Sequence, residues 1–134
     1  VTVRHRRSKA FEFDATHCPD LFPALVALAA NCEGTSTIYG TERLLHKESN
    51  RAVTLAEEYA KAGIEVDIDE ENIMRVRGGK IRGCTIDSHG DHRIAMSMAI
   101  AALTADAPIT VEGAECVAKS YPSFFDDLEQ LIVK

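Results

Sequence analysis

Hydrophobic and polar positions follow two periods along this chain, and each period marks one kind of element. Residues 11–14 alternate as in a strand, and Pro19 opens a helical run over residues 20–31. A second strand is predicted at residues 35–39. The side chains predicted to form the buried face of the first helix are Leu21, Ala24, Leu25 and Leu28.

A second helix and a hairpin follow. Residues 52–62 have the spacing of an amphipathic helix, and Gly63 is placed to stop it. Residues 64–68 and 73–76 flank an acidic turn, which is typical of a β-hairpin. The inward side chains predicted for this helix are Val53, Ala56, Tyr59 and Ala60.

The same order of elements then recurs. Strands are predicted at residues 84–87 and 109–112, and helices at residues 91–104 and about 123–132. In the last helix, Ser123 and an acidic residue three positions later have the spacing of a capping box.

Matching residues recur about 72 positions apart, which indicates an internal repeat. The chain is therefore predicted to be an α/β protein of about two repeated β-α-β-α-β-β units, at about residues 10–78 and 82–134, with helices packed against mixed sheets. The second unit stops before its hairpin, which either the N-terminal strands or residues outside the chain would supply. The matching pairs are Asp20 with Asp91, Gly40 with Gly113, and Lys47 with Lys119.

The composition indicates one globular domain or part of one. With 134 residues and 46% hydrophobic content the chain can bury a core, and a net charge of −6 argues against a nucleic-acid partner. No apolar stretch reaches the roughly 18 to 20 residues of a membrane span, and the N-terminus lacks a signal-peptide core. We therefore expect a cytoplasmic protein without a membrane partner. Because the chain begins with Val1, we also expect it to be a piece of a longer polypeptide.

Four widely spaced cysteines favour free thiols over disulfides or zinc. His89 and His92, with a cysteine nearby, form at most a partial metal site because a fourth ligand is not evident, so no metal is expected. The basic residues 4–9 are interpreted as a solvated terminal segment, with anion binding as the alternative. The four cysteines are Cys18, Cys32, Cys84 and Cys116.

Charged residues gather where predicted strands meet helices. Asp91, His92 and Arg93 begin a buried helix, whose unpaired N–H groups and dipole favour an anion. Alternatively, Asp91 only caps the helix while His92 and Arg93 face water. Junctions of one type tend to lie at one end of an α/β layer, so we expect the charged junctions to converge. The side chains expected to meet there are Asp20, Lys47, Glu48, Arg51, Arg93 and Lys119.

This mixture of charges has two interpretations. Four cations can hold a substrate with several negative charges, while a carboxylate among them moves a proton. Equally, Glu48 pairs with Arg51 three residues later and the lysines are solvated, because exposed ion pairs are common. Spacing alone does not choose between them.

Four blocks, in the same order, resemble the C-terminal part of the 5-enolpyruvylshikimate-3-phosphate (EPSP) synthase family, over about residues 11–131. The resemblance implies an enolpyruvyl-transferase-type domain. It also implies transfer of the enolpyruvyl group of phosphoenolpyruvate to the 5-hydroxyl of shikimate 3-phosphate, with release of phosphate and without a metal or organic cofactor. The blocks are Cys18-Pro19-Asp20, Lys47-Glu48-Ser49-Asn50-Arg51, Asp91-His92-Arg93-Ile94-Ala95-Met96 and Lys119-Ser120-Tyr121-Pro122-Ser123-Phe124-Phe125.

Residue roles follow from the same resemblance. Asp20 would bind the shikimate hydroxyls and take part in proton transfer at the attacking oxygen, and Glu48 would exchange the proton at the methylene carbon. Lys47 would contact shikimate 3-phosphate, and Asp91 and His92 would orient the cluster. The side chains that would hold the anionic groups of phosphoenolpyruvate are Arg51, Arg93 and Lys119.

Two departures from the family qualify the resemblance. The family usually has Asp where this chain has Asn50; Asn can still cap a helix, so we expect a local change in charge without loss of the site. The family enzyme closes two domains of three α/β units each over its substrates, whereas this chain covers roughly two units of one domain. We therefore expect the remainder of the parent enzyme as its partner, and no turnover by the chain alone.

Two alternatives stay open. UDP-N-acetylglucosamine enolpyruvyl transferase shares the architecture, although the Lys-Glu-Ser and Asp-His-Arg blocks favour the shikimate enzyme. A non-catalytic module that binds an anion, or RNA through residues 4–9, would use the same α/β unit.

Overall fold

The computed structural model describes residues 1–4, 6 and 8–132, and places their strands in two sheets. The larger sheet has the order β1-β2-β4-β3, with β1 parallel to β2 and the other pairs antiparallel. β5 and β6 form a second, parallel sheet. The strands are β1 (Glu12–Asp14), β2 (Thr35–Tyr39), β3 (Glu65–Asp67), β4 (Ile73–Arg77), β5 (Cys84–Asp87) and β6 (Ile109–Glu112).

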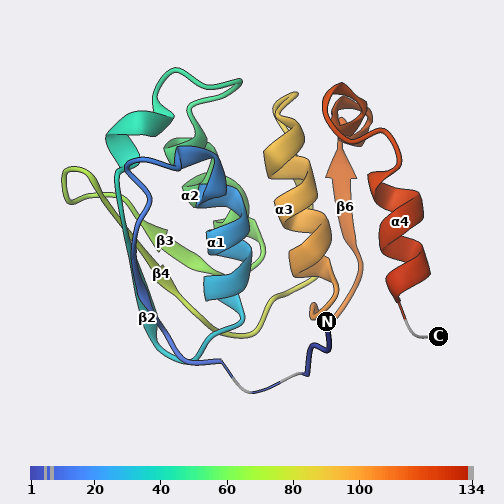
Figure 1. Cartoon of the computed structure of the whole chain (residues 1–134), viewed down its shortest axis with the longest axis horizontal. Helices are drawn as coiled ribbons and strands as arrows, with labels where there is room; N and C mark the ends of the chain where they lie inside the picture. Colours follow the sequence, from blue (N-terminus) through green and yellow to red (C-terminus); the bar gives the residue numbers. More distant parts are fainter. Residues whose placement is uncertain (5, 7, 133–134) are drawn as a thin grey trace.

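The helices lie between and beside these sheets (Figure 1). α1 and α2 pack against the four-stranded sheet, and α3 packs against both α1 and β6. α4 lies on the far side of β6. The helices are α1 (Phe22–Ala30), α2 (Arg51–Lys61), α3 (His92–Ala102) and α4 (Phe124–Leu131), with short 3-10 turns η1 (Pro19–Leu21), η2 (Thr41–Leu44) and η3 (Ala114–Lys119). The predicted α/β fold with helices on mixed sheets is confirmed.

One continuous core joins the two halves of the chain. Side chains from the larger sheet, from α1 and α2, and from β5 and α3 belong to the same buried cluster. Burial of large aliphatic and aromatic groups of this kind stabilises the fold by roughly 1.5 to 3 kcal/mol for each side chain. Fully buried members include Phe22, Ile38, Leu55, Met74, Ile86, Ile94 and Met98.

The turns after β2 and β6 are alike. Gly40 and Gly113 have φ angles of +111° and +73°, in the left-handed region that favours glycine, and each begins a 3-10 turn. A Cβ at Gly40 would lie 2.8 Å from the backbone of Thr16, whereas one at Gly113 would meet the side chain of Ser88 at 2.7 Å. The order β-α-β-η-α thus occurs twice, with the extra turn η1 before α1 in the first copy. The unit boundaries at about residues 10–78 and 82–134 remain a prediction.

Within the described residues, β6 pairs with β5 alone and β1 pairs with β2. The N-terminal strand therefore belongs to the first sheet and does not complete the second.

No helix among the residues that the structure describes has the length and apolar character needed to span a membrane. The four cysteines are free, as predicted; Cys32 and Cys116 are buried, and the other two are partly buried.

The predicted buried face of α1 is wrong. Leu21 and Leu28 are 44% and 49% exposed, whereas Phe22, Val26 and Ala29 are fully buried. Ala24 is also exposed, and Leu25 is partly buried. The helix is apolar on every side, so the spacing of its apolar residues does not define which side faces the core.

The predicted inward face of α2 is also largely wrong, for the opposite reason. Val53 and Ala60 are exposed, and Ala56 is only partly buried. Of the four predicted residues, Tyr59 alone is fully buried. The inward face carries charged groups, Arg51 and Glu58, which a pattern of apolar residues assigns to solvent.

Of the two helix caps predicted at Asn50 and Ser123, only the first is present. Asn50 precedes α2 and its side chain accepts a hydrogen bond from the backbone N–H of Val53 at 3.4 Å, so the expected cap is confirmed. The predicted capping box at Ser123 is wrong, because its hydroxyl donates instead to the carboxylate of Asp127 at 3.1 Å. α2 begins at Arg51, and Lys47 therefore lies in the loop before it.

Candidate active site

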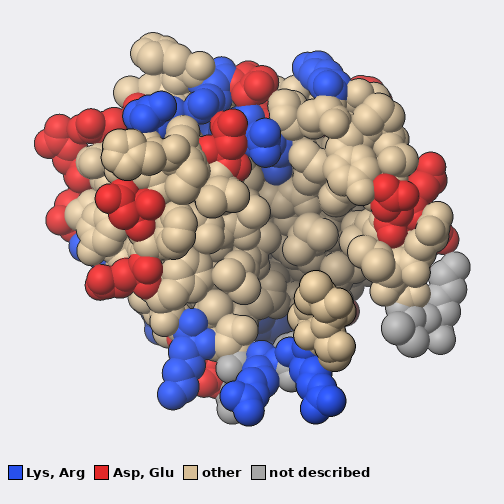
Figure 2. Space-filling view, in the orientation of Figure 1, with Lys and Arg blue, Asp and Glu red and all other residues tan. Residues whose placement is uncertain are grey.

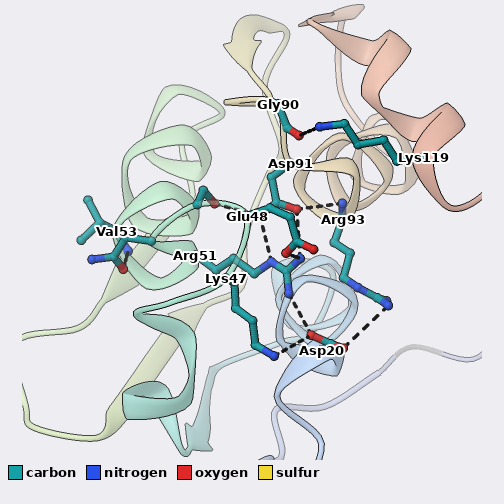
Figure 3. A network of polar contacts seen from close by, with 11 residues as sticks. Asp20, Lys47, Glu48, Arg51, Val53, Gly90, Asp91, Arg93 and Lys119 are labelled. Carbon is teal, nitrogen blue, oxygen red and sulfur yellow. Dashed lines mark hydrogen bonds and ion pairs between the residues drawn. The ribbon is translucent and has the colours of Figure 1, made fainter.

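A buried guanidinium lies at the centre of the charged junctions (Figure 3). The Arg51 side chain is 1% exposed, and its Nε donates to Asp91 at 2.8 Å while Nη1 donates to Asp20 at 2.9 Å. Its Nη2 donates to Glu48 and to the second oxygen of Asp91. Burial lowers the pKa of Arg51, but Asp91, Glu48 and Asp20 outweigh it and raise the pKa, so the group stays charged.

Asp20 is the carboxylate on which the cations converge. It lies in η1, the turn that Pro19 opens, and its side chain is 50% exposed. Besides Arg51, it faces Lys47 at 3.4 Å and Arg93 at 3.8 Å. Partial burial raises the pKa of Asp20, but the charge of Arg93 and the contacts with Lys47 and Arg51 lower it overall. Asp20 is thus ionised at neutral pH and open to a ligand.

Asp91 is fully buried and caps α3. Its Oδ1 accepts the backbone N–H of Arg93 at 3.0 Å, and its Oδ2 accepts from Ser49 and Arg51 at 2.8 Å each. Burial raises the pKa of Asp91, and the hydrogen bonds from Arg51 and Ser49 lower it overall. The predicted cap is therefore confirmed, but it is also one half of a buried ion pair between the two halves of the chain.

The remaining predicted residues lie around this centre. Glu48 is 44% exposed and contacts Arg51, so the simple pairing of these two residues and the convergence of the charges are both present. Lys119 does not face Asp20; its Nζ donates to the backbone oxygen of Gly90 at 3.1 Å (Figure 3). His92 is 8% exposed, and its buried Nδ1 has no hydrogen-bond partner among the described residues, so it does not face water.

A buried chain of hydroxyl groups fixes the backbone below the site. The Tyr59 hydroxyl lies 2.6 Å from Ser97 Oγ, and Ser97 donates to the backbone oxygen of Pro23 at 2.6 Å. These contacts tie α2, α3 and the first turn of α1 together next to Asp20. Burial raises the pKa of Tyr59, so its hydroxyl keeps its proton and can donate to Ser97.

A groove of about 240 Å³ opens beside Asp20, between α1 and α3. Its rim carries Asp20 and Arg93, and its floor is mostly apolar, with Ala27, Met96 and Ile100 among the lining residues. Charged groups of both signs also gather near this end of the molecule in the space-filling view (Figure 2). The site therefore combines an ionised carboxylate, exposed cations and a shallow apolar surface.

The sequence pattern did not assign a role to two side chains that support the site, Ser49 and Glu58. Ser49 donates to Asp91, and Glu58 contacts His89 in the turn that precedes Asp91. Glu58 stands seven residues after Arg51, and this spacing on one helix face was the available signal.

No group of three or more metal-ligating side chains gathers within the described residues. Of the basic segment 4–9, residues 5 and 7 lie outside the described residues.

Comparison with known proteins gives a consistent result. Residues 1–128 match the family described as EPSP synthase (3-phosphoshikimate 1-carboxyvinyltransferase). The 3-phosphoshikimate 1-carboxyvinyltransferase of Methanocella arvoryzae is 41% identical over 134 residues, which cover all of this chain and 32% of the relative. The enzyme of the same name from Clostridium acetobutylicum is 46% identical over 118 residues, covering 88% of this chain and 28% of the relative.

Solved structures agree with these sequence matches. EPSP synthase from Acinetobacter baumannii superposes with a TM-score of 0.74 at 38% identity, over 81% of this chain and 26% of that one. The enolpyruvyl transferase NikO from Streptomyces tendae, at 22% identity and a TM-score of 0.71, shares the fold over 95% of this chain and 29% of that one. The chain spans about a third of the length of the curated relatives it matches. Since the family match covers nearly every residue, this chain belongs to the EPSP synthase family.

Proposed function

We propose that this chain forms one wall of the active site of an enzyme that transfers the enolpyruvyl group of phosphoenolpyruvate to the 5-hydroxyl of shikimate 3-phosphate and releases phosphate. Membership of the EPSP synthase family and the names of its relatives support this reaction. The observation that carries the proposal is Asp20, a half-exposed carboxylate that faces three cations from two other segments of the chain, the loop-to-helix junction of α2 and the start of α3.

In the proposed reaction, Asp20 acts at the attacking oxygen. Its carboxylate is ionised, so it can accept the proton that the 5-hydroxyl loses as its oxygen bonds to the enolpyruvyl carbon. In that addition Glu48, in its protonated form, would deliver a proton to the methylene carbon. When phosphate leaves, Glu48 would take a proton back from the resulting methyl group, and the proton held by Asp20 would pass to the departing phosphate. Both carboxylates contact Arg51, which fixes their separation while leaving each partly exposed.

The cations would bind the anionic groups of the substrates. Lys47 and Arg93 are 28% and 38% exposed and lie on the two sides of Asp20, where phosphate or carboxylate oxygens can reach them. Lys119 is exposed beside the start of α3 and would reach the same region by leaving Gly90. Arg51 is buried, so we assign it to holding the acidic side chains unless ligand binding releases one of them.

The charge balance explains why a further wall is needed. Lys47, Arg51 and Arg93 face the carboxylates of Asp20, Glu48 and Asp91. Lys119, bound to the backbone oxygen of Gly90, adds one more positive charge, which leaves only a small positive excess for two polyanionic substrates. We therefore propose that the remainder of the parent enzyme supplies more cations and that the isolated chain does not turn over.

The net charge of −6 supports the absence of a nucleic-acid partner, and we propose a cytoplasmic location.

A phosphate-release assay tests this function. A full-length enzyme that carries these 134 residues is expected to release phosphate from phosphoenolpyruvate only when shikimate 3-phosphate is present. Release with UDP-N-acetylglucosamine instead would support the sugar-directed alternative and contradict the proposal. Substrate-dependent turnover by the chain alone would contradict the need for a second wall.

A further inference from the structure

A second buried carboxylate lies on the same face of α2 as Arg51. Glu58 is 2% exposed, two helical turns beyond Arg51, and it points to the connection between β5 and α3. Burying a carboxylate is costly unless it is paired and hydrogen-bonded. The partners of Glu58 therefore indicate what this residue does.

Glu58 binds the β5–α3 connection at two points. Its Oε2 accepts the backbone N–H of Asp87 at 3.1 Å, and its Oε1 lies 3.0 Å from Nε2 of His89. Because an ionised carboxylate only accepts, Nε2 of His89 carries the proton in this contact. Lys61, one helical turn further along α2, donates to both oxygens at 2.9 and 2.7 Å. Burial raises the pKa of Glu58, but these contacts lower it overall, so Glu58 is ionised.

The connection that Glu58 holds has an unusual backbone. His89 has a φ angle of +54°, in the left-handed region that is unfavourable for a residue with a Cβ, and Gly90 follows at +68°. The backbone N–H of His89 also donates to the carboxylate of Asp87 at 2.7 Å. Such a conformation persists only where the surroundings fix it, and Glu58 contacts Asp87, where the turn begins, and His89 within it.

This turn leads directly into the candidate active site. The backbone N–H of Asp91 donates to the backbone oxygen of Ser88 at 2.9 Å and so closes the turn. The Asp91 side chain then binds Arg51 and caps the helix that carries Arg93. From the other side, Lys119 donates to the backbone oxygen of Gly90. α2 thus holds the connection twice, through Arg51 at Asp91 and through Glu58 at the turn before it.

We propose that Glu58 is a positioning residue for the candidate site: through Asp87 and His89 it fixes the turn before α3, and so places Asp91 against Arg51 and Arg93 beside Asp20. Its part in turnover rests on the proposed function, whereas its part in the geometry does not. Glu58 does not touch the reacting groups. Its effect passes through the backbone of residues 87–91.

The geometric part is tested by ¹H–¹⁵N NMR of this chain. Glu58→Gln keeps the length of the side chain but removes the charge that binds Lys61 and His89. We expect the Nε–Hε resonance of Arg51 and the amide resonances of Asp91 and Arg93 to move by more than a linewidth. Resonances of β2 and β4, in the other sheet, should stay in place. The matched control is Glu57→Gln, an exposed neighbour on the same helix, which should move none of these site resonances.

The functional part is tested by kinetics of a full-length enzyme that carries these residues. Misplacement of a site by a fraction of an ångström lowers turnover strongly, so we expect Glu58→Gln to lower kcat about ten- to a hundredfold at a temperature where the variant is fully folded. KM should change less than kcat. Glu57→Gln should retain wild-type kcat.

A second variant covers the case in which Glu58→Gln does not fold. His89→Gly keeps a backbone that accepts the positive φ and removes only the imidazole that Glu58 holds, so it should fold and still lower kcat several-fold. In the double variant the combined loss should be smaller than the product of the two single losses, because both substitutions remove the contact between Glu58 and His89.

Unmoved site resonances, or a kcat for folded Glu58→Gln equal to that of Glu57→Gln, would overturn the proposal. Wild-type kcat in His89→Gly together with an unfolded Glu58→Gln would do the same, since Glu58 would then serve stability alone. If the wild-type full-length enzyme does not consume phosphoenolpyruvate and shikimate 3-phosphate, the proposed function fails, and the NMR comparison still decides the role of Glu58.

Discussion

Asp20 and Asp91 stand 71 residues apart at the same junction of the repeat, yet their surroundings differ. The Asp20 side chain is half exposed and faces cations of which two, Lys47 and Arg93, are partly exposed. Asp91 is fully buried and divides its oxygens between a helix cap, a serine hydroxyl and Arg51. One position in the repeat is therefore open to chemistry, while the other is a structural pair.

The repeated order of elements therefore fixes where a carboxylate stands but not what it does. Arg51 contacts both residues, and it does so from the loop-to-helix junction of the first unit. Its buried charge needs Asp91 for stability, whereas it contacts only Oδ1 of Asp20 and leaves Oδ2 to the more distant Arg93. The two aspartates should therefore respond differently to the same substitution.

The largest effect on stability is expected at Asp91. Asp91→Ala leaves the Arg51 guanidinium buried with a partner removed, and we expect a loss of about 3 to 5 kcal/mol in the free energy of unfolding. Urea denaturation of this chain measures the loss. Asp20→Ala should cost much less, because its side chain is half exposed, and equal losses would contradict the contrast between the two sites.

The next largest difference is expected between alanine substitutions at Gly40 and at Gly113. At Gly40 a methyl group adds left-handed strain and meets rigid backbone, so Gly40→Ala should lower the free energy of unfolding by about 3 kcal/mol. At Gly113 the obstacle is the Ser88 hydroxyl, which can rotate, and we expect about 1 to 2 kcal/mol. Thermal unfolding of both variants gives the order, and a costlier Gly113→Ala would contradict it.

Acid should weaken the buried pair. The pKa of Asp91 is below its usual 3.8 in the folded chain, so the unfolded chain binds the proton more readily and stability falls as pH drops below about 5. The pair is fully present above that range and is lost as pH passes through the folded pKa of Asp91. Between pH 7 and pH 2, denaturation curves should show that the free energy of unfolding falls less for Asp91→Asn than for the wild type. Parallel curves would show that Asp91 does not contribute.

The smallest effect concerns the helices that follow the 3-10 turns. Asn50 caps α2 through a long hydrogen bond, so Asn50→Ala should cost about 0.5 to 1 kcal/mol. Ser123 makes no cap bond at α4, and Ser123→Ala should stay within about 0.5 kcal/mol. Chemical denaturation measures the change in the free energy of unfolding for both variants. A larger loss for Ser123→Ala than for Asn50→Ala would contradict the assignment of Asn50 as a cap and of Ser123 as a residue without a cap bond.

Much of the fold could be predicted from the pattern of the sequence. Helices and strands fall within a few residues of their predicted positions, because the two periods and the turn glycines act locally. The buried faces of α1 and α2 could not be predicted. α1 is apolar on all sides, and the inward charges of α2 are stabilised by partners that are distant in the sequence, including Asp91 and His89.

The candidate site shows the same division. The convergence of Lys47, Arg51 and Arg93 on Asp20 followed from the junctions, but the burial of Arg51 did not, because it depends on three-dimensional packing. The contact of Lys119 with Gly90 was equally beyond the pattern, since a long side chain reaches many acceptors. The roles assigned to the individual residues stay predictions until turnover is measured.

In the proposed reaction, Asp20 is the proton-accepting carboxylate of an enolpyruvyl transfer site. Asp20→Asn in a full-length enzyme carrying these residues keeps the size and exposure of the side chain but removes its ability to accept a proton. The measurement is kcat for phosphate release from phosphoenolpyruvate and shikimate 3-phosphate, together with the free energy of unfolding. We expect kcat to fall about 100- to 10,000-fold with stability within about 1 kcal/mol of wild type. A stable variant with kcat within tenfold of wild type would contradict this role of Asp20.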